Sequence, residues 1–215
     1  MLEKGNYTLV SRLGWVYALT AGAIALAVTF FTSSLAASPL WGLALVCLFL
    51  FRDPDREIPS LPLAIVSPAD GTVVSVESIE DPYIKRPAIC ITIKMSFWGT
   101  YVTRSPTEGK VMERWFQAPH SSPGSDPGSD IASYGLWVQT DEQDDIVLVM
   151  TRRSAINRPH CYVQSGERIG QGQRCGVIRF GSDIQVYVPS NSKIAVQVGD
   201  KIRAGSDVIA TLVHK

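Results

Sequence analysis

The most constraining feature of this chain is residues 13–51, which contain no Asp, Glu, Lys, Arg or His. A globular domain of this size does not need so long an uncharged apolar run, whereas a helix that crosses a bilayer needs about 20 consecutive apolar residues. Residues 14–37 are long enough for such a helix, and Ser38-Pro39 then interrupts the run. Residues 40–51 would form a helix of only about 18 Å, which is short for an independent crossing. The sequence therefore predicts a transmembrane or re-entrant helical hairpin over residues 1–51.

Basic residues flank the apolar run on both sides, with Lys4 and Arg12 before it and Arg52 and Arg56 after it. By the positive-inside rule both ends of the hairpin face the cytoplasm, so we expect the rest of the chain on the cytoplasmic side of the cell membrane. A cleavable signal peptide is the alternative interpretation. Its apolar core would span only about 7–15 residues, far fewer than this run contains.

The charge balance and the cysteines exclude several classes of function. The chain has 20 Lys and Arg against 20 Asp and Glu, and this balance argues against nucleic acid as a partner. The cysteines occur singly and there are only three histidines, so no Cys/His metal site is predicted. Single cysteines in apolar or strand-like runs are typical of reduced, buried thiols in a cytosolic domain. They are Cys47, Cys90, Cys161 and Cys175.

After the apolar run the pattern changes to short β-branched segments. Pro54, Pro59 and Pro62 make residues 52–62 a stiff, extended connector. Residues 63–215 then contain runs such as TVVSVESI, AICITIKM and DIVLVMT, separated by Gly, Pro, Asn and Asp. This spacing is typical of an all-β sandwich or barrel. We therefore expect one mainly β domain behind the hairpin.

An internal repeat refines this expectation. Residues 163–172 and residues 196–205 both read V-Q-x-G-[ED]-[RK]-I-x-x-G. In each copy the first glycine suits a turn with positive φ, and the acid-base pair suits an exposed tip. Such turns build the folded-over hairpins of lipoyl-like and biotinyl-like domains, so we expect a β-sandwich or barrel of that type. A carrier domain of this kind has a lysine between its halves, whereas this chain has Gly181-Ser182 there.

Several short motifs follow one another from the end of the apolar run to the C-terminal region. They are Phe51-Arg52-Asp53-Pro54, Ser67-Pro68-Ala69-Asp70-Gly71, Met95-Ser96, Val102-x-Arg104-x-Pro106 and Phe180-Gly181-Ser182. In this order, and behind a two-part apolar hairpin, they resemble the phosphatidylserine decarboxylase family in its short, archaetidylserine-decarboxylase-like form. A set of motifs in order along one chain is far more specific than any one of them alone.

The resemblance implies a proenzyme that cleaves itself between Gly181 and Ser182 into a large and a small chain. The Ser182 hydroxyl would attack the Gly181 carbonyl, and elimination from the resulting ester would turn Ser182 into a pyruvoyl group, a covalent cofactor. The pyruvoyl carbonyl would then condense with the amine of a serine-headgroup phospholipid and accept the electrons released by decarboxylation. The implied reaction converts phosphatidylserine to phosphatidylethanolamine, and the implied partners are this lipid and the membrane that contains it.

Two further residues are implied as catalytic. Asp70 matches a family carboxylate and would orient groups around Ser182; alternatively, it stabilises the turn of its own Pro-Ala-Asp-Gly corner. Tyr101 stands where the family has a histidine that donates a proton during turnover, and Gly99 stands where the family has an aspartate. A phenol has a reference pKa near 10 against about 6.5 for imidazole, yet a hydrogen-bonded phenol can donate a proton.

The remaining assignments rest on residue type alone. Arg104 and Arg158 are candidates for binding the lipid phosphodiester, although solvated or ion-paired arginines are the ordinary alternative. His120 or His160 could supply the proton in place of Tyr101. Two other functions stay open: a catalytically silent or altered family member that acts as a membrane-bound β scaffold, and a lipoyl-like carrier or adaptor domain.

Overall fold

The computed structural model describes residues 12–31, 34–50, 54–117, 133–151, 159–178 and 183–213. The chain forms two compact units, Met1–Asp55 and Arg56–Lys215. The first unit is helical and the second is built from strands.

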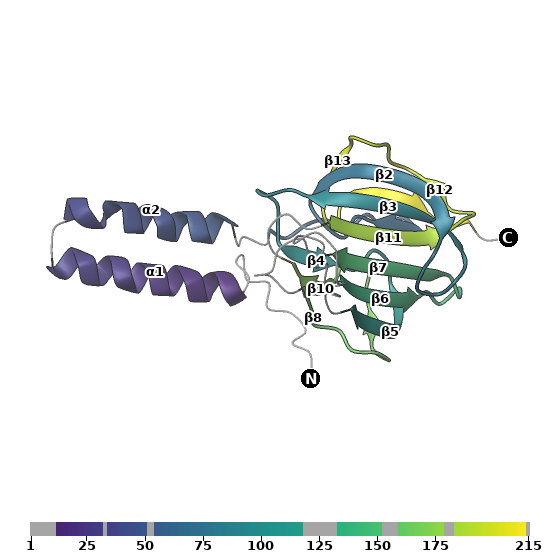
Figure 1. Cartoon of the computed structure of the whole chain (residues 1–215), viewed down its shortest axis with the longest axis horizontal. Helices are drawn as coiled ribbons and strands as arrows, with labels where there is room; N and C mark the ends of the chain where they lie inside the picture. Colours follow the sequence, from purple (N-terminus) through teal and green to yellow (C-terminus); the bar gives the residue numbers. More distant parts are fainter. Residues whose placement is uncertain are drawn as a thin grey trace, which may run out of the picture. The chain divides into compact units, whose positions relative to one another are not determined.

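The first unit is a pair of helices, α1 (Arg12–Phe31) and α2 (Ser34–Leu50), which pack side by side (Figure 1). The predicted interruption at Ser38-Pro39 is wrong, because Pro39 lies inside α2. Proline fixes φ near the helical value, but beyond the first turn its missing N–H leaves the carbonyl four residues earlier without its hydrogen bond. Pro39 is nevertheless accommodated in the second turn of α2.

The helix surfaces are apolar on more than one side. The exposed large side chains include Leu19, Leu26, Phe30 and Phe31 of α1 and Leu43 and Leu45 of α2. Within the described residues, no helix combines the length and the apolar character that a membrane crossing requires.

The second unit is built on one eight-stranded antiparallel sheet, which curls on itself in Figure 1. In spatial order its strands are β13 (Lys201–Ile202), β2 (Gly71–Glu80), β3 (Pro87–Met95), β11 (Asp183–Pro189), β7 (Asp145–Thr151), β6 (Ser133–Gln139), β5 (Gly109–Gln117) and β9 (Arg168–Ile169). The prediction of a mainly β domain is confirmed.

Two three-stranded sheets complete the second unit. The first contains β1 (Ala64–Val66), β14 (Val208–Thr211) and β12 (Lys193–Ile194), and the second contains β4 (Val102–Arg104), β10 (Arg174–Val177) and β8 (His160–Cys161). Strands β10 and β11, consecutive along the chain, therefore belong to different sheets.

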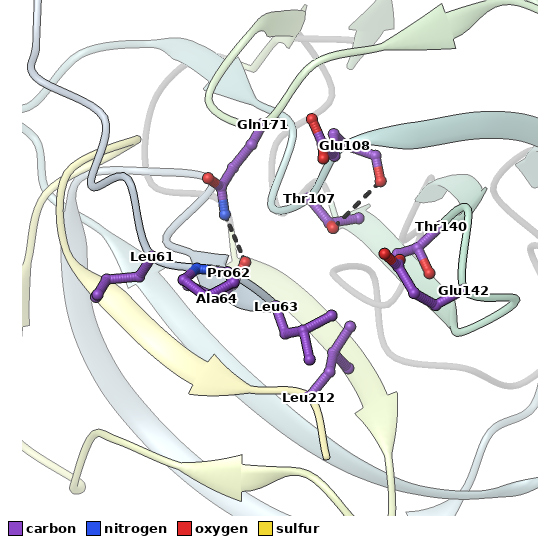
Figure 2. A pocket seen from close by; sticks show the side chains of 10 residues that line it. All are labelled: Leu61, Pro62, Leu63, Ala64, Thr107, Glu108, Thr140, Glu142, Gln171 and Leu212. Carbon is purple, nitrogen blue, oxygen red and sulfur yellow. Dashed lines mark hydrogen bonds between the residues drawn. The ribbon is translucent and has the colours of Figure 1, made fainter. Parts of the chain in front are cut away.

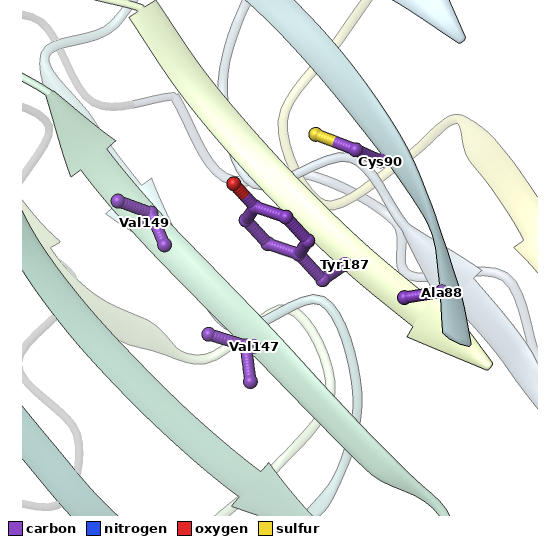
Figure 3. Packing of buried hydrophobic residues seen from close by; sticks show 5 residues of the cluster. All are labelled: Ala88, Cys90, Val147, Val149 and Tyr187. Carbon is purple, nitrogen blue, oxygen red and sulfur yellow. The ribbon is translucent and has the colours of Figure 1, made fainter. Parts of the chain in front are cut away.

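The centre of the large sheet is buried on both faces. On one face Val186 of β11 pairs with Ile91 of β3 and Leu148 of β7, and all three side chains are fully buried. On the other face a second cluster packs around Tyr187 (Figure 3). Its members are Ala88, Cys90, Val147, Val149 and Tyr187, with Tyr83, Ile84, Trp115 and Trp137 packed against them. Full burial of each large aliphatic side chain contributes about 1.5–3 kcal/mol, so β11 is held firmly in the middle of the sheet.

The cysteines of the second unit are buried, as the sequence predicts. Cys90, Cys161 and Cys175 are free thiols in the described part of the chain. The side chain of Cys47 lies outside the described residues.

The two sequence repeats form equivalent turns at the two edges of the large sheet. Gly166 and Gly199 have positive φ angles of 89° and 99°, which confirms the predicted turn conformation. Their N–H groups donate to the carbonyls of Val111 (2.7 Å) and Val73 (2.8 Å). The strands that follow, β9 and β13, pair with β5 and β2.

Each edge also contains a Ser-Pro-x-x-Gly corner, residues 67–71 before β2 and residues 105–109 before β5. In both corners the serine hydroxyl donates to the carbonyl two residues later at 2.7 Å. The serine carbonyl accepts the N–H of Gly205 in the first corner (2.7 Å) and of Gly172 in the second (2.9 Å). The duplication thus includes a corner, an edge strand and a closing turn on each side of the sheet.

Candidate active site

One end of the large sheet gathers the candidate residues, and we call it the site end. It is formed by Gly71 at the start of β2, Met95 at the end of β3, Asp183 at the start of β11 and Thr151 at the end of β7. Gly71 pairs with Met95, and Asp183 lies between Lys94 and Thr151. The antiparallel register therefore brings segments that are far apart in the sequence to the same place.

The predicted cleavage position belongs to a connection that returns to this end. Gly181 and Ser182 lie outside the described residues. Their flanks are described: the Ile178 N–H donates to the Tyr101 carbonyl at 3.0 Å, and Asp183 begins β11. The connection thus starts beside Tyr101 and ends between β3 and β7.

Asp70 immediately precedes β2, and its carboxylate accepts four hydrogen bonds. Arg56 donates from Nη1 to Oδ1 at 2.6 Å and from Nη2 to Oδ2 at 2.7 Å, which makes a bidentate ion pair. The backbone N–H groups of Ala204 and Thr100 donate to Oδ1 at 2.8 Å and to Oδ2 at 3.0 Å. Asp70 therefore joins three distant parts of the chain at the site end.

These donors determine the charge of Asp70. Burial on its own raises the pKa of the carboxyl group, but the hydrogen bonds from Arg56, Ala204 and Thr100 and the charge of Arg56 together lower the pKa below 3.8. The carboxylate is consequently ionised at neutral pH, with both oxygens engaged. All four donors lie outside residues 67–71, and both roles expected for Asp70, orienting groups around Ser182 and stabilising its own corner, stay predictions.

The loop of residues 96–101 packs directly on Asp70. The Ser96 N–H donates to the Asp70 carbonyl at 2.9 Å, and the Gly99 N–H donates to the Ser96 carbonyl at 3.2 Å. A Cβ atom added at Gly99 would lie 2.6 Å from the Asp70 Cβ, closer than two carbons can approach. This contact is a physical reason for glycine at the position where the resembling family has aspartate.

Tyr101 follows this loop, and its side chain is buried, with 3% exposed. Its hydroxyl donates to the Phe97 carbonyl at 2.7 Å. Burial raises the pKa of the phenol above 10. Tyr101 is therefore a neutral hydrogen-bond donor over the whole physiological pH range.

Arg104, a candidate for binding the lipid phosphodiester, is buried between the two repeats. Its residue is only 5% exposed, its Nη1 donates to the Gly172 carbonyl at 3.2 Å, and a Cβ at Gly205 would touch its Cδ at 2.9 Å. The side chain thus contacts the closing glycines of both repeats. Its contribution to phosphodiester binding stays a prediction.

The other candidates divide into residues outside and inside the described part. Arg158 and His120 lie outside it. His160 is exposed at the start of β8, where it pairs with Val177, and its ring lies 5.4 Å from that of Tyr162. The register places His160 one residue from Ile178, at the beginning of the connection to β11.

Arg56 is a residue of the site that the sequence did not predict as one. The sequence presented it as a positive flank of the apolar run, whereas the structure pairs it with Asp70, and the two side chains are only 14% and 12% exposed. Its position two residues after the family-like motif Phe51-Arg52-Asp53-Pro54 was the available signal.

A pocket of about 120 Å³ lies at the opposite end of the large sheet, which we call the distal end (Figure 2). Its polar lining includes Glu108 of the second corner and Thr140 and Glu142 of the turn between β6 and β7. Gln171 and Thr107, which also line it, are hydrogen-bonded to backbone carbonyls of the same pocket. The pocket is therefore separate from the site end.

Comparisons with known proteins identify the family of this chain. The family model for phosphatidylserine decarboxylase matches residues 43–210. A phosphatidylserine decarboxylase proenzyme of Nitrosomonas eutropha is 37% identical over 211 residues, which cover 95% of each chain. Proenzymes of the same description from Nitrosomonas europaea (36% over 206 residues, 95% of each chain) and Aromatoleum aromaticum (34% over 214 residues, 99% of this chain and 100% of the relative) are also similar. No solved structure gives a significant match.

The match covers both the end of the helical unit and nearly the whole β domain. The chain therefore belongs to the phosphatidylserine decarboxylase family, a family of carboxy-lyases.

Proposed function

We propose that this chain is a phosphatidylserine decarboxylase proenzyme that cleaves itself between Gly181 and Ser182. The observation that carries the proposal is the anchoring of both flanks of this bond: Ile178 is bonded to Tyr101, and Asp183 pairs on both sides with the large sheet. Because β10 and β11 belong to different sheets, cleavage between them interrupts no strand.

The strand pairing also keeps the two products together. The small chain, residues 182–215, would contain β11, which lies between β3 and β7, and β13 and β14, which pair with β2 and β1 of the large chain. Ile184, Val186, Val188 and Ile209 of the small chain are fully buried. Separation of the chains would expose this core, so the cleaved enzyme remains one folded unit.

The cleavage chemistry needs only the chain itself and water. The Ser182 hydroxyl oxygen bonds to the Gly181 carbonyl carbon as the peptide C–N bond breaks, which gives an ester. Loss of the Ser182 Cα proton and of the Cβ–O bond then expels Gly181 as a carboxylate. Addition of water to the resulting dehydroalanine releases ammonia and leaves the pyruvoyl group at position 182.

The surroundings of position 182 fit this group. It immediately precedes β11, whose backbone pairs with β3 from Asp183 to Pro189, so the residue next to the new chain end is held in a central strand. When formed, the pyruvoyl carbonyl supplies an electron sink for decarboxylation of an amine-bearing substrate. Tyr101, bonded through its carbonyl to the flank of this segment, is our proposed proton donor, since its phenol stays protonated at neutral pH. Asp70 and Arg56 position the loop that carries Tyr101.

We further propose that the helical unit attaches the protein to the cytoplasmic side of the cell membrane as a re-entrant hairpin. The support is its exposed apolar surface, which includes Leu26, Phe30 and Phe31, together with the basic residues at both ends of the apolar run. A hairpin that enters only one leaflet does not need helices of full bilayer length.

Intact mass and a denaturing gel test the proposal. The wild type should give two chains whose masses correspond to residues 1–181 and 182–215. The small chain should start with a pyruvoyl group and react with hydrazine. Ser182→Ala should remain a single 23.5 kDa chain without a reactive carbonyl.

Ser190→Ala is the matched control, because Ser190 lies in the turn after β11, at the other end of the same strand. It should be processed normally. A Ser182→Ala protein that still loses its C-terminal fragment would show that host proteolysis, and not self-processing, makes the cut. Normal cleavage without release of carbon dioxide from phosphatidylserine would favour a catalytically silent family member.

A further inference from the structure

The loop of residues 96–101 exposes two large aromatic side chains at the site end. Phe97 and Trp98 are 49% and 61% exposed, and their rings meet edge to face with centroids 5.2 Å apart. Trp115 and Trp137, in contrast, stack at 6.4 Å within the cluster around Tyr187. A paired, exposed phenyl and indole group is the kind of apolar patch that marks an interaction surface.

The loop cannot relieve this exposure by folding back. Its backbone is attached to Asp70 at both ends, through the Ser96 N–H at 2.9 Å and the Thr100 N–H at 3.0 Å. In the middle, the Phe97 carbonyl accepts the Tyr101 hydroxyl at 2.7 Å. Asp70 itself is held by Arg56. The rings are therefore presented on a braced backbone.

The two ends of the large sheet differ in what they expose. Phe116, near the end of β5 at the site end, is a third exposed aromatic residue, and Lys94 is exposed one residue before the end of β3. At the distal end, the turn between β6 and β7 exposes Asp141, which accepts a hydrogen bond from Arg168 at 2.6 Å, and Glu142. The two ends therefore differ in their exposed aromatic rings more than in charge, because Lys94 lies opposite Asp183 in the strand pairing and Asp141 is paired with Arg168.

Chain connectivity points in the same direction. Arg56, the first residue of the β unit after the apolar helices, is bonded to the carboxylate on which the loop sits. The chain therefore enters the β domain at the site end. Indole and phenyl rings prefer the headgroup level of a bilayer, where an apolar ring and a polar edge are both satisfied.

We propose that Phe97 and Trp98 insert into the headgroup region of the bilayer and seat the site end on the membrane from which the lipid is taken. The inference rests on the proposed function, because that function places the substrate in a bilayer. The loop acts by seating the domain, while turnover of a substrate dissolved in water does not require it.

Quenching by brominated lipid tests the contact directly. Full-length protein is bound to vesicles of phosphatidylcholine and phosphatidylserine in which the phosphatidylcholine carries bromine on its acyl chains. W98F keeps an aromatic ring and removes the indole, so the quenched fraction of tryptophan fluorescence should fall below that of the wild type. W137F is the matched control: Trp137 donates its Nε1–H to Asp145 near the distal end at 2.9 Å, so its removal should raise the quenched fraction. An unchanged or raised fraction in W98F would overturn the proposal.

Kinetics provide a second measurement. W98S should raise KM for phosphatidylserine in vesicles by about tenfold, the loss expected when one ring no longer leaves water, with kcat unchanged. Turnover of a water-soluble, short-chain phosphatidylserine should stay within about twofold of the wild type, since that substrate needs no seating. I79S, which changes an exposed side chain near the distal end of β2, should behave as wild type on both substrates.

The outcomes separate the two proposals. A wild type that decarboxylates neither substrate would refute the proposed function, whatever the quenching shows. An active wild type whose W98S variant loses vesicular and soluble turnover equally would overturn the seating role, because the loop would then serve only the structure of the site.

Discussion

The corner at residues 67–71 and the corner at residues 105–109 share their backbone contacts and differ in what their acidic residue binds. Asp70 in the first corner is buried and accepts two hydrogen bonds from Arg56. Glu108, at the equivalent place in the second corner, is exposed and lines the pocket at the distal end. The duplicated corner thus has two different environments. The difference arises from the other segments of the chain that pack against each corner.

The candidate site is therefore made by additions to a symmetric frame. The corner and the closing turn recur on both sides of the sheet. What distinguishes the site end is Arg56 from the connector, the braced loop of residues 96–101, and the connection that carries Gly181-Ser182.

The largest expected difference between the corners comes from neutralising their acidic residues. In a Ser182→Ala background, which keeps the chain intact, Asp70→Asn should lower the free energy of unfolding by about 3–5 kcal/mol, because it leaves the buried Arg56 guanidinium without its counter-charge. Glu108→Gln should change it by less than about 0.5 kcal/mol. Urea unfolding measures both. Similar losses in the two variants would abolish the distinction between the corners.

The stabilisation by the Asp70–Arg56 ion pair should also depend on pH. The pKa of Asp70 is lowered in the folded protein, so its stabilisation is fully present above its unfolded pKa of about 3.9 and is lost as pH falls through the lower folded pKa. The stability difference between the parent and Asp70→Asn should therefore be constant from neutral pH down to about 5 and shrink below about 4. A difference that shrinks already near neutral pH would contradict the ionised, arginine-bound state.

A smaller effect is expected from the packing of the loop on Asp70. Gly99→Ala places a methyl group against the Asp70 Cβ and should destabilise the domain by about 1–3 kcal/mol and slow self-cleavage. Gly170→Ala is the control, since its Cβ would meet only the Gln173 side chain at 3.5 Å. Thermal unfolding in the Ser182→Ala background gives the stabilities, and a gel time course gives the cleavage rates. Equal behaviour of the two variants would show that the loop is not braced by Asp70.

The smallest structural change concerns Tyr101, which has no counterpart in the distal turn. Burial raises the pKa of its phenol, so wild-type kcat should not fall on the alkaline side until above about pH 10. In Tyr101→His the donor would be an imidazole, and kcat should fall as pH rises through about 6.5. Tyr162, an exposed residue directly after β8, is the control: Tyr162→His should keep the wild-type dependence of kcat on pH. Superimposable profiles for wild type and Tyr101→His would exclude Tyr101 as the donor.

Much of the fold follows from local patterns in the sequence. Short β-branched runs such as AICITIKM predict strands, and DIVLVMT, which is apolar between its two end residues, corresponds to β7, which is buried along its centre on both faces. The V-Q-x-G repeats predict turns with positive φ at Gly166 and Gly199. The position of the helix break was wrong because a proline signal is ambiguous close to a helix start, where Pro39 lies.

The candidate site was less accessible to local reasoning. Its motifs pointed to Asp70 and Tyr101, but the partner of Asp70 is Arg56 of the connector, 14 residues earlier in the chain. The second corner at residues 105–109 was not predicted, because Ser-Pro and Gly are common turn residues. Arg104 has the residue type of a phosphate ligand, yet its side chain contacts the closing glycines of the two repeats.

By itself the sequence determined the apolar hairpin, the mainly β character of the rest and the family motifs, because all three are written in neighbouring residues with a fixed period or order. Only the tertiary structure decided that Arg56 neutralises Asp70, that Gly99 lies against the same carboxylate and that the flanks of Gly181-Ser182 return to this end of the sheet. The physical reason is that strand register and burial bring together groups separated by many residues, and a charge or a hydroxyl group acquires its function from the partners that this folding places around it.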